Sequence, residues 1–193
     1  MNSPRVLIVV FAALVSLSAC EKKKELEPKA AATKPSGAAG YVINFKPNDS
    51  PDLVPAKTVM LVQSAAQGTN NFCLDVQAKA FEELAAVSFT LNLDPAMVEY
   101  QSFRPGTLFE GKGNVAYQVA LLPDQKNKLA VRISFETATS ATGGTGKAVT
   151  LCFKAKADGR SDVVLENGQV LDAKKQAVGG VNWVSGLLWV LTG

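Results

Sequence analysis

Apolar residues recur at every second position along most of the chain beyond residue 40, in short runs separated by Gly, Pro, Asn and Asp. This alternation is typical of antiparallel strands that have one face in a core and one face in water, and helical periodicity is nearly absent. About nine strands over residues 41–193 predict an all-β fold, a two-sheet antiparallel β-sandwich, with a closed barrel as the alternative. The clear runs are 57–65, 70–80, 85–93, 128–136, 147–157 and 161–170, and the weaker ones are MVEYQSF, NVAYQVALL and VNWVSGLLWVLTG.

The parity of two runs predicts which side chains enter the core. In NNFCLDVQAKA we expect Phe72, Leu74, Val76 and Ala78 to face inward, and in the late run we expect the same of Val149, Leu151, Phe153 and Ala155. The opposite parity, which includes Cys73, Asp75 and Lys79 in the first run and Thr150 and Cys152 in the second, is expected on the outer side.

The N-terminus predicts export. Residues 6–19, VLIVVFAALVSLSA, are apolar but too short for a comfortable bilayer span of about 20 residues, and a positive charge precedes them. Residues 1–19 are therefore interpreted as a signal peptide. Leu17-Ser18-Ala19-Cys20 resembles the bacterial lipobox, and this resemblance implies that the Cys20 sulfur carries a diacylglycerol (palmitate-type acyl chains) that holds the protein on the membrane. The alternatives are an ordinary cleaved signal with an incidental cysteine, or an uncleaved anchor.

The residue after the cysteine bears on localisation. Lipoproteins retained in an inner membrane commonly carry Asp there, whereas this chain has Glu21, so the resemblance favours the outer membrane of a bacterial cell envelope, facing the periplasm or the cell surface. Residues 20–40 then form the lipidated cysteine and a disordered tether rich in Lys, Glu, Ala and Pro. From Tyr41 onward there are 14 basic and 14 acidic residues, so residues 41–193 form a neutral domain without the basic footprint of a nucleic-acid-binding protein.

The order of the strands resembles a cohesin-type domain, a jelly-roll sandwich also related to some cellulose-binding modules. The segment FTLNLDPAMV (89–98) parallels the family's aromatic-x-apolar-x-Tyr-Asp-Pro-x-x-Leu pattern, with Leu93 where the family has Tyr, and LCFKAKADG parallels its late strand. The resemblance covers residues 57–193. Within it, Asp94-Pro95 predicts a turn in which the carboxylate accepts hydrogen bonds from the next backbone amides.

The resemblance also implies a disulfide. In the cohesin-type strand order the strands that carry Cys73 and Cys152 are antiparallel neighbours, so the two thiols come within bridging reach in an exported chain. Closing this loop is worth about 4 kcal/mol in the chain-entropy model. The alternative is two unpaired cysteines. No metal is expected, because two thiols in a chain without histidine fall short of the four ligands of a structural zinc site.

The residue types argue against an enzyme. The absence of histidine excludes the Ser-His-Asp and Cys-His constellations, and the carboxylates are scattered over strand ends and turns instead of being paired across a cleft. TGGTGKAV (142–149) departs from a phosphate loop, because Ala148 follows the lysine and Ala141 occupies the place of the first glycine, and it is interpreted as a flexible loop. No cofactor is expected.

Two candidate binding surfaces follow. The runs 85–93 and 128–136 should expose small and polar side chains, and in cohesin-type domains the equivalent sheet carries the protein partner; the alternative is an ordinary solvated face. This first candidate consists of Ser88, Thr90, Asn92, Arg132 and Ser134.

The second candidate is a pair of tryptophans. Trp183 and Trp189 share a strand parity, so they form a sparse sugar-stacking platform if that parity faces outward, and core if it faces inward. Core is favoured for at least one, because VNWVSGLLWVLTG is apolar on both faces. The sequence thus predicts a non-catalytic adaptor or scaffold that binds a protein, with recognition of a polysaccharide as the alternative and a purely structural envelope component as a third.

Overall fold

Eleven strands and one three-residue 3-10 helix occupy the residues that the computed structural model describes, which are 40–64, 68–137 and 140–193. These residues belong to one compact unit, Ala38–Gly193. The predicted signal peptide, the lipidation site Cys20 and nearly all of the tether lie outside the described residues.

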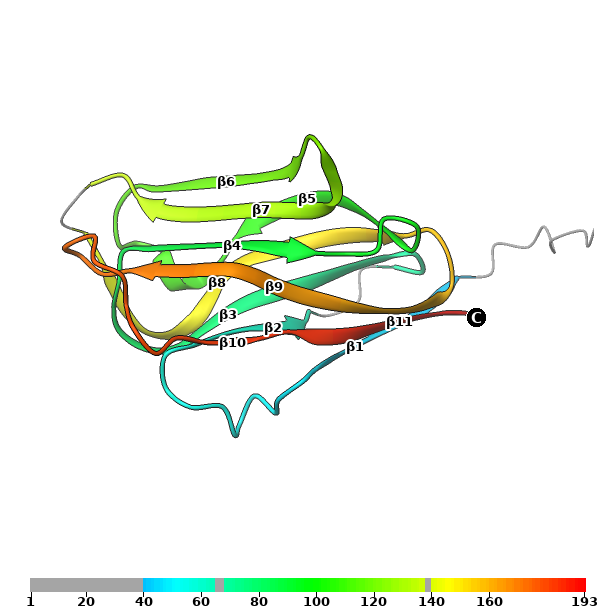
Figure 1. Ribbon diagram of the computed structural model, residues 1–193, viewed down its shortest axis with the longest axis horizontal. Helices are drawn as coiled ribbons and strands as arrows, with labels where there is room; N and C mark the ends of the chain where they lie inside the picture. The colour runs from blue at the N-terminus through cyan, green and yellow to red at the C-terminus, as the bar shows by residue number, and fades with distance from the viewer. Residues whose placement is uncertain (1–39, 65–67, 138–139) are drawn as a thin grey trace, which may run out of the picture. The chain divides into compact units, whose positions relative to one another are not determined.

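The strands form two sheets (Figure 1). The order β1-β11-β9-β4-β7-β6 makes the six-stranded sheet and β10-β2-β3-β8-β5 the five-stranded sheet, and every neighbouring pair is antiparallel except the parallel pair β10 and β2. The bounds are β1 Tyr41–Pro47, β2 Thr58–Gln63, β3 Asn71–Leu84, β4 Ala86–Asn92, β5 Val98–Pro105, η1 Thr107–Phe109, β6 Val115–Leu122, β7 Gln125–Phe135, β8 Thr142–Ala155, β9 Gly159–Leu171, β10 Asn182–Val184 and β11 Gly186–Thr192.

The all-β sandwich predicted from the alternation is confirmed, but the N-terminal and C-terminal strands differ from the prediction. Strand β1 was not predicted, although Tyr41, Ile43 and Phe45 alternate toward the core. The C-terminal run is two strands in different sheets, because the chain crosses between them at Ser185. Gly186 permits this crossing: a Cβ there would lie 2.2 Å from the Phe45 ring.

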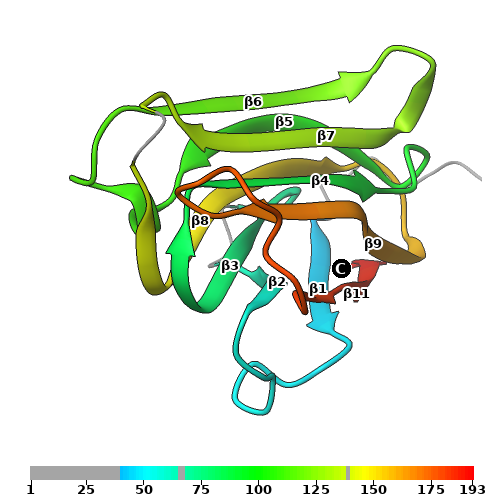
Figure 2. The same cartoon turned by 60° about the vertical axis from the view of Figure 1, so that its left-hand side comes forward.

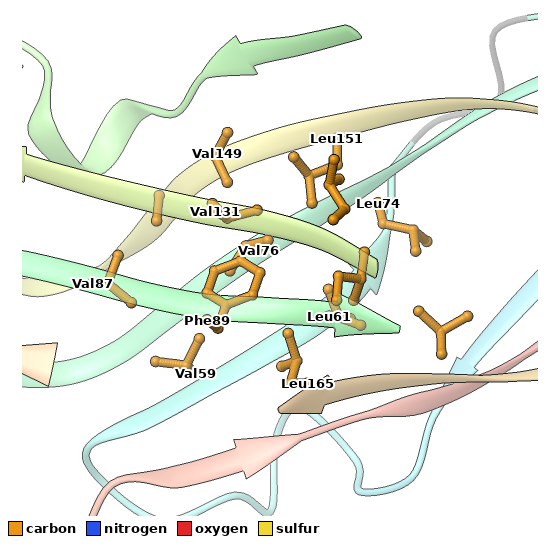
Figure 3. Packing of buried hydrophobic residues seen from close by; sticks show 14 of the residues in the cluster. Val59, Leu61, Leu74, Val76, Val87, Phe89, Val131, Val149, Leu151 and Leu165 are labelled. Carbon is orange, nitrogen blue, oxygen red and sulfur yellow. The ribbon is translucent and has the colours of Figure 1, made fainter. Parts of the chain in front are cut away.

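A single hydrophobic core fills the space between the sheets (Figure 3). Phe89 and Val131 enter it from the six-stranded sheet, and Leu74, Val76 and Leu151 enter it from the five-stranded sheet. Each fully buried aliphatic or aromatic side chain of this kind contributes about 1.5–3 kcal/mol relative to exposure, so the alternation supplies most of the driving force for stacking the sheets.

The inward parity predicted for β3 and β8 is confirmed for all eight residues. The opposite parity is not fully solvated, however: Cys73, Asp75, Thr150 and Cys152 are buried on the outer side of the five-stranded sheet. These positions lie on central strands, so neighbouring side chains cover them from both sides, as in the Lys147 ion pair with Asp75. Parity therefore predicts which side of the sheet a side chain faces, but it does not predict whether neighbouring side chains bury it there.

The loop between β1 and β2 covers part of the same outer side. Val54 from this loop packs with Met60 and Val184 in a small second cluster. Lys79, predicted to face outward, donates from Nζ to the carbonyl oxygens of Pro51 and Val54 at 3.1 and 3.2 Å. The loop is therefore fastened over β2.

The glycine-rich segment 142–149 is the first half of β8 and not the predicted loop. It pairs with the end of β3 through an irregular register in which Phe81 faces Gly144 and Ala78 faces Gly146. Gly143 is needed there, because a Cβ would lie 2.4 Å from the carbonyl oxygen of Glu82. The turn at Asp94 is as predicted, with the Ala96 amide donating to its carboxylate at 2.8 Å.

One side-chain amide joins the two sheets at the β1 edge. Gln63 at the end of β2 accepts a hydrogen bond from the Phe45 amide at 2.7 Å and donates to the Ile43 carbonyl at 3.0 Å. It satisfies the backbone of β1 as a neighbouring strand would, and thereby closes the sandwich on this side.

We expect Gln63→Ala to lower the free energy of unfolding by about 1–3 kcal/mol, because two part-buried backbone groups of β1 lose their partners. Urea unfolding followed by circular dichroism measures this change. Gln101→Ala, at an exposed glutamine of β5, is the control and should change it by less than about 0.5 kcal/mol. Equal effects of the two substitutions would contradict this role of Gln63.

Candidate functional site

The outer face of the six-stranded sheet brings the first candidate residues together. Val87, Phe89 and Leu91 of β4 point into the core, so Ser88, Thr90 and Asn92 point outward. On the neighbouring strand β7, Arg132 lies opposite Ser88, and Ser134 lies opposite Ala86. Arg132 is exposed, and the other four candidates are half-buried. All five therefore share one surface, as parity predicts.

A shallow hollow of about 390 Å³ lies in this face. The small side chains of Ser88, Ala120 and Ala130 line it together with the longer side chains of Gln118 and Arg132. Four strands contribute: Ala120 of β6 is opposite Ala130 of β7, which is opposite Thr90 of β4, and Asn167 comes from β9. The row of small side chains across adjacent strands produces a depression that a protruding side chain or helix of a partner can enter. We call this depression the hollow; the side chains that line it and are used below are Ser88, Thr90, Gln118, Ala120, Ala130 and Arg132.

A polar network fixes the side of the face next to the hollow. Lys128 Nζ lies 2.8 Å from a carboxylate oxygen of Glu166, and the Asn92 amide donates to the other oxygen at 3.2 Å. Asn127 in turn donates to the Asn92 side-chain oxygen at 2.9 Å. The hydrogen bonds from Lys128 and then from Asn92 hold the pKa of Glu166 below its ordinary value of 4.5. Asn92 is thus a fixed group, whereas Arg132 extends into solvent.

The two tryptophans do not form a platform. Trp183 is on β10 of the five-stranded sheet, where it packs on the core with its ring 6.1 Å from that of Phe89 and against Gly168. Trp189 is on β11 of the six-stranded sheet and points outward beneath the Arg160 guanidinium, 5.8 Å from the ring centroid. A core position was favoured for at least one of them, and Trp183 is partly buried against the core; their common parity has no structural meaning because they occupy different sheets.

An apolar corner was missed in the sequence. Val42 and Leu191 lie opposite each other on β1 and β11 and are 51% and 52% exposed. Trp189 lies on the same outward parity as Leu191. The alternation in residues 41–47 was the available signal, because it indicates a strand in which Val42 faces outward.

Cys73 and Cys152 form a disulfide between directly opposite positions of β3 and β8, the pairing that the resemblance implied. Arg104 of β5 lies over it, with a guanidinium nitrogen 3.7 Å from the Cys152 sulfur. Two positions along β3, the Asp75 carboxylate accepts a 2.6 Å hydrogen bond from Thr150 and pairs with Lys147 at 3.1 Å. This cluster is on the outer side of the five-stranded sheet, away from the hollow, and its polar contacts are internal, so it has a structural role.

The described residues contain no group of three or more His, Cys, Asp or Glu side chains placed to hold a metal ion. Within the same ranges, no helix has the length and apolar character needed to cross a bilayer. Cys20 lies outside these ranges, and its lipidation stays a prediction.

The comparisons with known proteins agree with the sandwich. A type II cohesin domain from the cellulosome of Acetivibrio cellulolyticus matches with a TM-score of 0.59 and 13% identity, covering 71% of this chain and 95% of that one. A non-cellulosomal cohesin from the archaeon Archaeoglobus fulgidus matches with a TM-score of 0.55 and 14% identity, covering 72% and 93%. A third cohesin from Acetivibrio cellulolyticus, solved in complex with a dockerin, matches with a TM-score of 0.57 and 15% identity, covering 70% and 99%.

These solved structures show the class of fold, a cohesin-like β-sandwich. The family model for the Cohesin domain matches residues 58–186, which is most of the described sandwich. The chain therefore belongs to the Cohesin domain family. A search of the curated proteins gave no match.

We expect Lys128→Met to raise the pKa of Glu166 toward 4.5, because the main donor to its carboxylate is removed. Carboxyl-resolved NMR titration of the chain from residue 21 onward measures this shift, and Lys174→Met, at an exposed lysine of a turn, is the control. Since the folded pKa of Glu166 is depressed, its stabilising contribution is present above the unfolded value and is lost as the pH falls through the folded pKa.

The stability difference between the wild type and Lys128→Met should therefore be largest near neutral pH and should shrink as the pH falls below 4.5 and through the depressed folded pKa of Glu166. A difference that grows on acidification would contradict the role assigned to the Lys128–Glu166 pair.

Proposed function

We propose that the hollow and the polar network beside it bind another protein of the dockerin class, and that the chain is a non-catalytic adaptor or scaffold. The observation that carries this proposal is the hollow itself, a depression of small side chains with Arg132 in its lining, next to the fixed Asn92–Glu166–Lys128 network. Family membership supports it, since one of the similar cohesins was solved in complex with a dockerin.

The chemistry of the face suits a protein partner. Small side chains allow close approach, Arg132 offers a guanidinium for a carboxylate or carbonyl of the partner, and the network supplies oriented polar groups without further ordering. A partner that covers the hollow buries Arg132, which lines it, so truncation or charge reversal of Arg132 should weaken binding.

Carbohydrate recognition has less support. The sequence basis for this alternative was a pair of tryptophans on one strand, whereas Trp183 and Trp189 lie in different sheets and Trp183 packs on the core. We therefore keep polysaccharide binding only as an outcome that the binding experiment can detect.

The adaptor is proposed to be anchored in the bacterial cell envelope through Cys20. The lipobox-like segment before Cys20 and the charged, Pro-containing tether after it support this placement. In this proposal the tether holds the domain away from the membrane, and Glu21 favours the outer membrane.

We expect Arg132→Glu to weaken binding to a dockerin domain from the same genome by about tenfold or more, equivalent to about 1.4 kcal/mol. Titration calorimetry against each such purified domain measures the Kd. Arg160→Glu is the matched control, because Arg160 is an exposed arginine of the same six-stranded sheet that lies beside Trp189, outside the hollow.

Three results would count against the proposed surface: equal losses from the two substitutions, no loss from either, or no binding of any dockerin. Binding to cellulose or xylan that is lost in Trp189→Ala would instead support carbohydrate recognition.

We expect Cys20→Ala to prevent acylation, so that the protein no longer incorporates labelled palmitate and is recovered with soluble proteins after cell fractionation. Ser18→Ala, which keeps small residues before the cysteine, is the control and should stay with the membranes. Membrane recovery of Cys20→Ala would contradict the anchor while leaving the binding face untouched.

A further inference from the structure

Strand β6 forms one edge of the six-stranded sheet, and its outer edge carries no other strand among the described residues. It pairs with β7 along Val115 to Leu122 and is the last strand in the sheet order (Figure 2). An unpaired edge presents a row of backbone N–H and C=O groups that can pair with another strand.

The register shows which residues of β6 present these groups. The Glu136 amide donates to the Asn114 carbonyl, so even-numbered residues of this segment bond toward β7. The Phe135 amide donates to Ala85 on the other side, as this alternation requires. The odd-numbered residues therefore direct their backbone groups away from β7, in the plane of the sheet and toward its free side; these residues are Val115, Tyr117, Val119 and Leu121.

The other three sheet edges in the described part of the chain are protected. Edge β1 has the Gln63 side chain hydrogen-bonded to its backbone and carries Lys46 and Pro47. Edge β10 is only three residues long. Edge β5 has a register shift between Tyr100 and Ser102, carries charged residues and ends in a proline. Short length, bulges, prolines and charges are the usual devices that prevent edge pairing.

Edge β6 has none of these devices over most of its length. Its eight residues, VAYQVALL, contain no charge and no proline, and the register shift falls at the last position, Leu122. Leu121 is 44% exposed, and Val115, Tyr117 and Val119 are half-buried at the margin of the core. A further strand here would cover these side chains.

We propose that β6 pairs with β6 of a second copy of this chain, antiparallel and about a two-fold axis at Gln118. In this register Tyr117 faces Val119 of the other copy and Val115 faces Leu121. The four residues of each copy whose backbone groups point away from β7 therefore exchange backbone hydrogen bonds with the other copy. Tyr117 opposite Val119 is favourable, because aromatic residues opposite β-branched ones are good cross-strand pairs. The side-chain amides of the two Gln118 residues meet at the axis.

A second copy fits this edge because the strand is complementary to itself. With no charge between residues 115 and 122, two copies meet without like-charge repulsion, and the small residues Ala116 and Ala120 face each other across the pair. The two six-stranded sheets then become one continuous sheet whose outer faces lie on the same side. The two hollows, which Gln118 and Ala120 line, would lie next to each other.

Cysteine substitution tests both the pairing and its register in the chain from residue 21 onward, which lacks the predicted lipid. Gln118→Cys places two thiols opposite each other across the axis, whereas in Ala116→Cys the two thiols are about 13 Å apart along the strands. After mild oxidation we expect about tenfold more linked dimer from Gln118→Cys. Equal amounts from the two variants would overturn the register.

Sedimentation equilibrium from low to several hundred micromolar tests the association without cross-linking, and we expect a reversible dimer. Leu121→Pro should abolish it while leaving the fold intact, because the lost N–H points away from β7. Gln118→Lys should raise the dimer Kd about three- to fivefold by placing like charges opposite each other, while Gln169→Lys on β9 of the same sheet should not. A chain that stays monomeric throughout this range, or a dimer that survives Leu121→Pro, would overturn the proposal.

Discussion

The alternation of apolar and polar side chains, with one face of nearly every strand in the core, is the constraint on which the rest of the structure depends. It assigns each sheet one inner and one outer face. Local contacts then decide whether the residues of each outer face are buried or exposed to solvent. On the five-stranded sheet those contacts are internal: the loop from β1 to β2 packs Val54 onto Met60, and Asp75 is paired with Lys147. On the six-stranded sheet the small residues of the hollow stay open to solvent. This difference between the sheets selects the face on which a partner is proposed.

The sequence predicts those parts of the fold in which local alternation is enough. The parity of β3 and β8 placed eight residues in the core correctly, because period-two alternation needs no knowledge of neighbours. Strand β1 was missed because prolines and aspartates follow it closely and its partner, β11, is at the other end of the chain. The division of the C-terminal run at Ser185 likewise depends on Gly186 meeting the Phe45 ring, a contact between distant segments.

The candidate site divides in the same way. That Ser88, Thr90 and Arg132 share a face follows from parity alone, and the structure places them together. The hollow depends on which strands are neighbours, because its lining combines Ala120 of β6 with Ala130 of β7. The Glu166 network joins β9 to β4 and β7, and β9 lies beside β4 although the two strands are far apart in the sequence. The shared parity of the two tryptophans did not predict a common face, because these residues of one apolar run belong to different sheets.

The location of the disulfide bears on how the proposed face works. Cys73 and Cys152 join the two central strands of the five-stranded sheet, and the Asp75–Thr150 hydrogen bond joins the same strands two positions further on. The open face is on the other sheet and is held through the shared core, which transmits rigidity because it is closely packed. A face positioned in this way loses little conformational freedom on binding, which lowers the cost of association. Because residues 41–193 carry equal numbers of basic and acidic side chains, long-range steering would add little to the proposed binding, and its selectivity would rest on short-range fit in the hollow and on single charges such as Arg132.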